Sequence, residues 1–175
     1  MGKITFILGG AGSGKSKFAL KMANEGKNVA FVATCDSKDG EMKRKIDAHR
    51  EERPSHWPTI EAGSTPFELV WPNGKTDCLM IDSLTLWVSE LLMREIPSEE
   101  ILRKCEACLN EARKRFEHTI VVSDEVGFGI VPENRLARDF RELLGKINQQ
   151  AALMSEEVFF VAAGLPIKMK TKETI

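Results

Sequence analysis

Residues 9–16 of the chain read GGAGSGKS, between the apolar run KITFIL (residues 3–8) and the segment KSKFALKMA (residues 15–23). The octapeptide fits the pattern G-x-x-x-x-G-K-[ST], and it stands between a predicted strand and a predicted helix, as this motif requires. Glycines let backbone N–H groups turn inward around a phosphate, and the positive end of the helix dipole adds to the attraction. A glycine-rich turn that binds nothing fits this context less well. The stretch predicts a phosphate-binding loop made of Gly9, Gly10, Ala11, Gly12, Ser13, Gly14, Lys15 and Ser16.

Two side chains of this loop are expected to act on the nucleotide directly. Lys15 should reach the β- and γ-phosphates, and the Ser16 hydroxyl should ligate Mg²⁺. A second metal ligand should end another hydrophobic strand, and Asp82 stands in that place. Asp82 is alternatively the N-cap of a helix that begins at Ser83, because aspartate is a favoured cap.

The rest of the chain alternates short apolar runs with segments of helical periodicity. Strands are predicted at residues 28–34, 77–82, 119–124 and 158–164, and helices at residues 41–53, 83–93, 98–117 (N-cap Ser98) and 132–154. Apolar strands without alternation suit a sheet covered on both faces, and right-handed crossovers favour parallel pairing. We therefore predict a three-layer α/β fold with a mostly parallel sheet, the RecA-like architecture of P-loop NTPases. A single domain should span residues 1–175.

Ligands of such sheets bind beyond the carboxyl ends of the strands. Asp124 and Glu125 stand there, at the end of the strand at residues 119–124. Either can orient a nucleophile or contact the metal through water. The sequence alone does not choose between these carboxylates and Asp82.

The composition of the chain argues against nucleic acid and membranes as binding partners. The chain is 42% hydrophobic and 29% charged, with a formal net charge of −1, so it carries no basic footprint for nucleic acid. No apolar run is long enough to span a bilayer, and the N-terminal run is too short for a signal-peptide core. We expect no membrane insertion, a cytoplasmic location and a small-molecule partner.

Four cysteines are spread along the chain, at Cys35, Cys78, Cys105 and Cys108. Such sparse spacing indicates reduced thiols, not a disulfide framework. Cys105 and Cys108 form a C-x-x-C pair, but no second pair of ligands stands at a zinc-like spacing. We expect these two residues to fill a helix interface.

Several stretches resemble one family. They are GGAGSGKS, FVATCDSKDGEMKRKIDAHREERPSHWPTIEA, MIDSLTLWVSELL, VVSDEVGFGIVPENRLARDFRELLGKINQQAA and VFFVAAGLPIKMK. They are similar, in order, to the bifunctional adenosylcobinamide kinase / adenosylcobinamide-phosphate guanylyltransferase of cobalamin biosynthesis. The resemblance implies that ATP or GTP phosphorylates the aminopropanol hydroxyl of adenosylcobinamide. GMP then moves from GTP to that phosphate through a guanylylated histidine, giving adenosyl-GDP-cobinamide. It also implies a homo-oligomer, for which a trimer is one arrangement.

The resemblance assigns residues as well. The guanylylated histidine corresponds to His49, in the pattern I-x-x-H-[RK]-x-x-R-P-x-H-W, whereas His56 matches a second recurrent histidine without an assigned role. The chain departs from the family at Gly12, which usually is arginine, and at Asp124, which usually is asparagine. The segments implied to contact the guanine nucleotide contain Thr34, Cys35, Asp36, Arg50, Glu51, Glu52, Arg53 and Glu61.

His49 has a second interpretation. At helical spacing it shares a face with Met42 and Ile46, where a packed histidine would also lie. Arg50 and Arg53, however, supply cations that can hold a triphosphate near the imidazole. A neutral imidazole is then a competent nucleophile.

The other two histidines are expected to be structural. His56, in a proline-flanked loop, suits ring hydrogen bonds better than catalysis. His118 stands where a helix gives way to a strand, and its positive form would suit the end of that helix.

Two rival functions remain. A kinase without guanylyl transfer would bind the same nucleotides but would never be labelled by the α-phosphate of GTP. A nucleotide-gated regulatory ATPase would expose a long apolar or basic patch, and the sequence pattern indicates neither.

Overall fold

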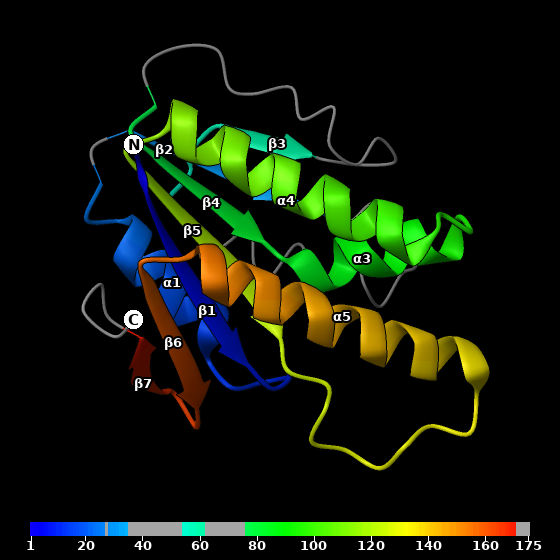
Figure 1. Ribbon diagram of the computed structural model, residues 1–175. Helices are drawn as coiled ribbons and strands as arrows, with labels where there is room; N and C mark the ends of the chain where they lie inside the picture. The colour runs from blue at the N-terminus through cyan, green and yellow to red at the C-terminus, as the bar shows by residue number, and fades with distance from the viewer. Residues whose placement is uncertain (27, 35–53, 62–75, 171–175) are drawn as a thin grey trace.

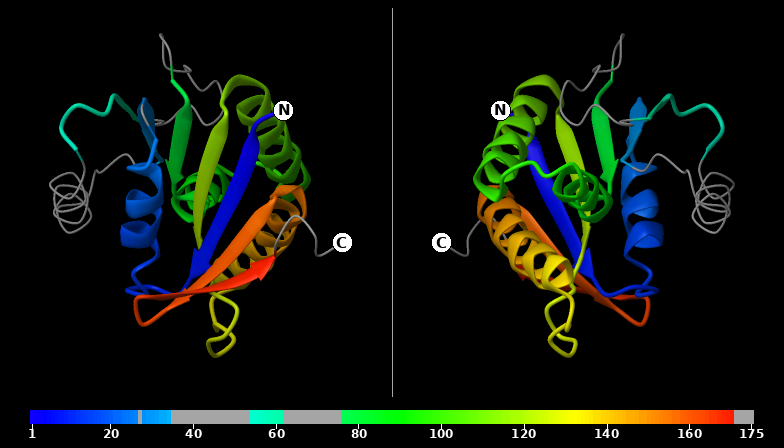
Figure 2. Two further views of the ribbon diagram at one scale, coloured as in Figure 1. Left: turned by 90° about the vertical axis from the view of Figure 1, so that its left-hand side faces the viewer. Right: turned by 90° about the vertical axis from the view of Figure 1, so that its right-hand side faces the viewer.

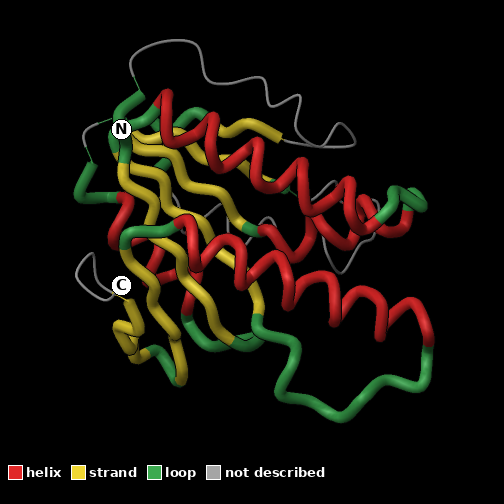
Figure 3. The backbone as a smooth tube through the Cα atoms, in the orientation of Figure 1, coloured by secondary structure: helices red, strands yellow, loops and turns green. Residues whose placement is uncertain are grey.

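The computed structural model describes residues 1–26, 28–34, 54–61 and 76–170. Its strands are β1 (Lys3–Gly9), β2 (Val29–Ala33), β3 (Thr59–Glu61), β4 (Cys78–Asp82), β5 (His118–Asp124), β6 (Glu157–Ala162) and β7 (Leu165–Lys170). Its helices are α1 (Lys15–Ala23), α3 (Leu84–Met93), α4 (Ser98–Arg115) and α5 (Arg135–Met154). Figure 3 shows the strands side by side, with helices in front of and behind them.

The described strands form one seven-stranded sheet in the order β3-β2-β4-β5-β1-β6-β7. All neighbours pair in parallel except β6 and β7, which are antiparallel. The carboxyl ends of the parallel strands therefore share one edge, and the segments that follow β1 and β5 leave the sheet there (Figure 1). The register sets Gly9 of β1 opposite Asp124 of β5 and Val161 of β6.

Helices cover both faces of this sheet (Figure 2). α1 packs on one face, against β1, β4, β5 and β6, and α3, α4 and α5 lie on the other. Strands covered on both sides can be apolar on both sides, which explains the continuous apolar runs of β1 and β5. The predicted three-layer fold with a mostly parallel sheet is confirmed.

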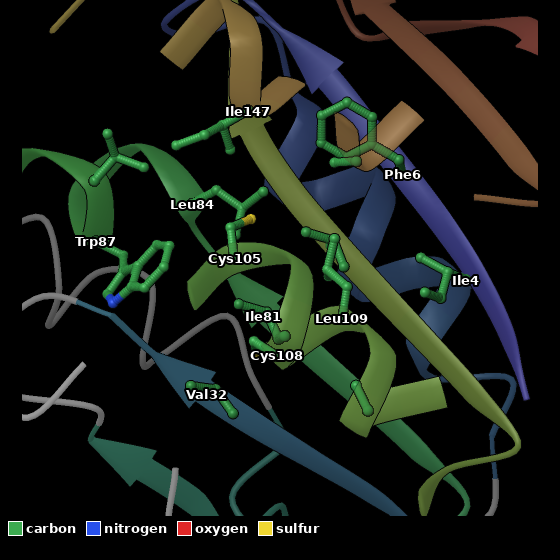
Figure 4. Packing of buried hydrophobic residues seen from close by; sticks show 14 of the residues in the cluster. Ile4, Phe6, Val32, Ile81, Leu84, Trp87, Cys105, Cys108, Leu109 and Ile147 are labelled. Carbon is green, nitrogen blue, oxygen red and sulfur yellow. The ribbon is translucent and has the colours of Figure 1, made fainter. Parts of the chain in front are cut away.

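The larger core lies between the sheet and the three helices α3, α4 and α5 (Figure 4). Ile4 and Phe6 of β1 and Leu109 of α4 are fully buried in it. Cys105 and Cys108 point into the same core, so their expected role as helix filler is confirmed. Burial raises the pKa of the Cys105 thiol to about 12, which keeps this thiol protonated and unreactive.

α5 begins at a side-chain cap. Asn134 Oδ1 accepts a hydrogen bond from Ala137 N at 3.2 Å, so the helix starts at Arg135 and not at Pro132 as predicted. The cap satisfies one of the N–H groups that a helix start leaves without a partner. The residues between β5 and this cap therefore form a loop.

Two predicted caps differ in the structure. The Pro97 carbonyl accepts the first hydrogen bonds of α4, so Pro97 is the N-cap, and the prediction of Ser98 in that role is wrong. Ser83 is the N-cap of α3. Asp82 is thus the last residue of β4 and does not cap the helix, which removes the alternative interpretation of its carboxylate.

The sequence analysis missed the two outer strands. β3 has three residues, too few to show a periodicity. In β7, Leu165, Ile167 and Met169 alternate with polar residues or proline, a pattern typical of a strand at a sheet edge. β6 ends before its predicted limit because Ala163 and Gly164 have positive φ and form the turn to β7.

The structure does not test two of the predictions. The helix at residues 41–53 lies outside the described residues, and the single domain over residues 1–175 stays a prediction. Of the helices that the structure describes, none combines the length and the apolar composition needed to cross a membrane.

His118 begins β5, and its Nε2 atom lies 2.9 Å from Thr5 Oγ1. Burial lowers the pKa of His118, and the Lys3 ammonium lowers it further, against smaller upward effects of Glu157 and Glu25. The neutral form is favoured. This lowered pKa disfavours the positive form that would suit the end of the preceding helix.

We expect His118→Gln to flatten the pH dependence of stability on the acid side of neutrality. Because the folded pKa lies below the ordinary value of 6.5, the neutral ring stabilises the fold above that pH. This stability is lost as the pH falls towards the folded pKa, at up to about 1.4 kcal/mol per pH unit. Urea unfolding from neutral pH to about pH 5 measures the slope. Thr5→Val, which keeps the histidine, should retain the slope, and an unchanged slope in His118→Gln would contradict this account.

Candidate functional site

The phosphate-binding loop leaves β1 at Gly9 and ends at Lys15, where α1 begins. Gly12 and Gly14 have φ of 69° and 88°, in the left-handed region that favours glycine. The Gly14 carbonyl accepts the first helical hydrogen bond, from Phe18 N at 3.0 Å. The N–H groups of the first turn of α1 therefore face the carboxyl edge of the sheet, as an anion site requires.

Neighbouring strands hold this loop in place. Glu125 N donates to Gly9 O at 3.0 Å, and Gly164 N, in the β6–β7 turn, donates to Ser13 O at 2.8 Å. The packing is also close, since a Cβ placed on Gly14 would lie 3.1 Å from Gly164 Cα. The loop is thus held by a backbone hydrogen bond from the residue after β5 and by contacts with the turn of the β6–β7 hairpin.

The Lys15 side chain is only 11% exposed. Its Nζ atom lies 2.5 Å from Asp124 Oδ1 and donates a hydrogen bond to Gly10 O at 3.2 Å. The ammonium expected to meet the phosphates is therefore paired with a carboxylate at the end of β5. Its contact with the β- and γ-phosphates stays a prediction.

Side chains from two helices hold the backbone of Asp124. Thr85 Oγ1, on α3, accepts a hydrogen bond from Asp124 N at 2.7 Å. Asn148 Nδ2, on α5, donates to Asp124 O at 3.0 Å, and Asn148 is only 6% exposed. Sequence reasoning gave neither position a role, although both lie in stretches that resemble the family, because only the packing of α3 and α5 on β5 brings them to this point.

The predicted metal ligands lie at the same edge of the sheet. Ser16 is half-buried in the first turn of α1, and Asp82 is half-buried at the end of β4. β5 separates β4 from β1, so Asp82 is one strand farther from the loop than Asp124. Hydroxyl and carboxylate oxygens suit Mg²⁺, which binds through one or two carboxylates together with phosphates and waters.

Within the described ranges, no group of three or more His, Cys, Asp or Glu side chains could hold a metal ion. Ser16 and Asp82 as its protein ligands stay a prediction.

Thr34 joins the ends of β2 and β4. Its Oγ1 atom donates to Ser83 O at 2.6 Å and accepts from Ser83 N at 2.8 Å, and its own N–H donates to Asp82 O at 3.4 Å. Glu61 ends β3, the outermost strand on that side of the sheet. The remaining predicted site residues lie outside the described residues: Cys35, Asp36, His49, Arg50, Glu51, Glu52 and Arg53.

Exposed apolar side chains gather at the β6–β7 hairpin, whose turn contacts the phosphate loop at Ser13. Phe128 and Ile130, in the segment after β5, are 84% and 95% exposed. The Phe128 ring lies 6.1 Å from the Phe160 ring, between centroids, and the β6–β7 register sets Phe160 opposite Ile167 and Ala162 opposite Leu165. Residues directly opposite share a face of the hairpin. We name this surface the apolar rim, made of Phe128, Phe160, Leu165 and Ile167.

The fold and the loop define a P-loop nucleotide-binding enzyme of the RecA-like type. Two solved structures share the fold. One is an ATPase of the type III secretion system of pathogenic bacteria, with a TM-score of 0.57, 13% identity, and coverage of 96% of this chain and 57% of that chain. The other is a KaiC-like protein from Pyrococcus horikoshii, with a TM-score of 0.50, 15% identity, and coverage of 90% and 70%.

The chain belongs to the cobinamide kinase / cobinamide phosphate guanyltransferase family, whose model matches residues 5–169. The bifunctional adenosylcobalamin biosynthesis protein CobP of Pseudomonas aeruginosa is 40% identical over 172 residues, covering 94% of this chain and 95% of the relative. CobU of Escherichia coli, which carries the same description, is 34% identical over 181 residues, covering 94% and 98%. The family resemblance found in the sequence, and with it the prediction of a transferase, is confirmed.

We expect Gly14→Ala to destabilise the protein and to abolish tight binding of nucleoside triphosphate. An alanine at this φ costs about 1–2 kcal/mol, and its Cβ would press on the backbone of Gly164. Thermal unfolding and titration with a fluorescent triphosphate measure the two effects. Gly145→Ala is the matched control, because nothing lies within 4 Å of its added Cβ on α5. Equal behaviour of the two variants would refute the role of the left-handed turn.

Proposed function

We propose that the chain phosphorylates adenosylcobinamide with ATP or GTP and then transfers GMP from GTP to adenosylcobinamide phosphate. The carrier is a guanylylated His49, and the product is adenosyl-GDP-cobinamide. The observation that carries the proposal is the family match over residues 5–169, to relatives of about the same length. The braced phosphate loop supports it independently.

One phosphate loop suits both reactions. In the kinase step, the substrate hydroxyl oxygen bonds to the γ-phosphorus, the bond from this phosphorus to the bridging oxygen breaks, and the hydroxyl proton is released. In the first transfer step, the His49 imidazole attacks the α-phosphorus and pyrophosphate leaves. Lys15 would neutralise charge on the departing phosphates in both cases. Mg²⁺, held by Ser16 and Asp82, would supply further charge stabilisation.

The second transfer step completes the proposal. A phosphate oxygen of adenosylcobinamide phosphate attacks the phosphorus of the histidine-bound GMP, and the bond from phosphorus to imidazole breaks. Arg50 and Arg53 are the cations proposed to hold the triphosphate near His49, with the segments of Thr34 and Glu61 at the guanine nucleotide.

The apolar rim suits a large acceptor. Adenosylcobinamide is a broad macrocycle, and the rim lies beside the loop that would hold the phosphoryl donor. A homo-oligomer, of which a trimer is one arrangement, also belongs to the proposal. The cytoplasmic location and the lack of a nucleic-acid partner stay predictions from composition.

Labelling with α-tagged and γ-tagged GTP, with and without cobinamide, separates the two reactions. We expect Lys15→Ala to lose both, because both need the β- and γ-phosphates held. His49→Asn should lose the α label and guanylyl transfer but keep most of its kinase activity, whereas His56→Asn, the matched control, should keep the α label. The bond to GMP should be labile in acid and stable in base, unlike an acyl phosphate.

Other outcomes of this experiment identify the rivals. A wild-type protein that phosphorylates cobinamide but never takes the α label is a kinase alone. One that hydrolyses triphosphate without modifying cobinamide is the regulatory ATPase. Normal α labelling of His49→Asn would refute the proposed mechanism, although the chain would still belong to the family.

Ser16→Ala and Asp82→Asn should each raise the Mg²⁺ concentration needed for half-maximal kinase activity. Each variant loses a hard oxygen ligand, whereas metal-free nucleotide binding should change little. Titration of kinase activity with Mg²⁺ measures the midpoint. A midpoint unchanged in both variants would remove these residues from the metal site.

A further inference from the structure

The partner of Lys15 in this structure is the Asp124 carboxylate. The two charged groups lie 2.5 Å apart, with side chains 11% and 24% exposed. Charges so little exposed are screened weakly by solvent and salt, so this ion pair is stronger than one on the surface. The Asp124 carboxylate therefore neutralises the positive charge of Lys15 before an anion approaches it.

The carboxylate is attached to a rigid point of the fold. Asp124 lies opposite Gly9 in the β1–β5 register, so it stands directly beside the strand that leads into the loop. Its N–H and C=O groups are held by Thr85 and Asn148, at 2.7 Å and 3.0 Å. A shift of the Asp124 backbone would break both of these hydrogen bonds, so the fold opposes it.

We propose that Asp124 competes with the terminal phosphates of the nucleotide for Lys15 and thereby sets the affinity of the site for triphosphates. A phosphate oxygen that reaches Nζ must replace the carboxylate oxygen. The displaced carboxylate then lies next to the bound phosphate, so the complex also carries a repulsion between like charges. Both effects weaken triphosphate binding.

The competition is specific to the nucleotide's terminal phosphates. Lys15 is expected to contact the β- and γ-phosphates, so a nucleoside monophosphate does not reach the ion pair. The inference rests on the proposed function only in requiring that the loop bind nucleoside triphosphates. It makes no use of the acceptor or of His49.

The test is Asp124→Asn, which keeps the shape of the side chain and removes its charge. Affinity for a non-hydrolysable GTP analogue, measured with EDTA present, should rise by about tenfold or more, as expected on removing a competing charge at this distance. Affinity for GMP should stay the same. The triphosphate should also stabilise the variant against heat more than it stabilises the wild type.

Controls separate the ion pair from other causes. Asp139→Asn on α5 removes the same charge away from the site, where Asp139 pairs with Arg135, and it should leave triphosphate affinity unchanged. Asp124→Ser, a second neutral variant, should reproduce the gain if Asp124→Asn folds poorly.

Three results would overturn the inference. Triphosphate affinity that does not rise in either neutral variant excludes competition. An equal rise for GMP shows a general charge effect. Weaker binding with Mg²⁺, without any change in EDTA, makes Asp124 a metal-site residue instead. A wild type that binds no triphosphate under any condition would instead contradict the proposed function.

Discussion

The parallel pairing of β1 with β5 and β6 is the constraint on which the site depends. Its register sets Gly9 opposite Asp124 and Val161, so the loop begins between two strand ends that point the same way. Only in this register can Glu125 N reach Gly9 O while the β6–β7 turn reaches Ser13 O. A slip of β1 by one residue would turn every β1 side chain to the opposite face of the sheet. Ile4 and Phe6, which pack in one core, would then have to fit the other core, where Ile7 packs now. The packing of the strands therefore fixes the position of the loop.

Strand ends in a parallel sheet have few partners for their backbone groups, and here side chains provide them. Thr85 and Asn148 bind the N–H and C=O groups of Asp124, and Thr34 binds both backbone groups of Ser83. A buried backbone group without a partner costs about 1–3 kcal/mol, so these hydrogen bonds stabilise the edge as well as ordering it. The carboxylates are consequently held by the fold before any ligand binds.

The sequence was sufficient for the features that local rules govern. The phosphate loop follows from its glycines and their place between a strand and a helix, and the layered fold follows from apolar strands that alternate with helices. Boundaries were less accurate, because capping depends on single contacts such as Asn134 with Ala137. The pairing of Lys15 with Asp124 needs the strand order, since these residues are more than a hundred positions apart. The lowered pKa of His118 could not be predicted, because it results from burial of the ring, which the sequence does not show.

The proposed reactions differ in the phosphorus atom that is attacked, yet both need Lys15 at the terminal phosphates. On this proposal, the loop and Lys15 serve both reactions in the same way and do not select between the two. Selection must come from whichever nucleophile is in place, the acceptor hydroxyl or the imidazole of His49. One phosphate loop would then serve two reactions that differ in the nucleophile and in the phosphorus atom attacked.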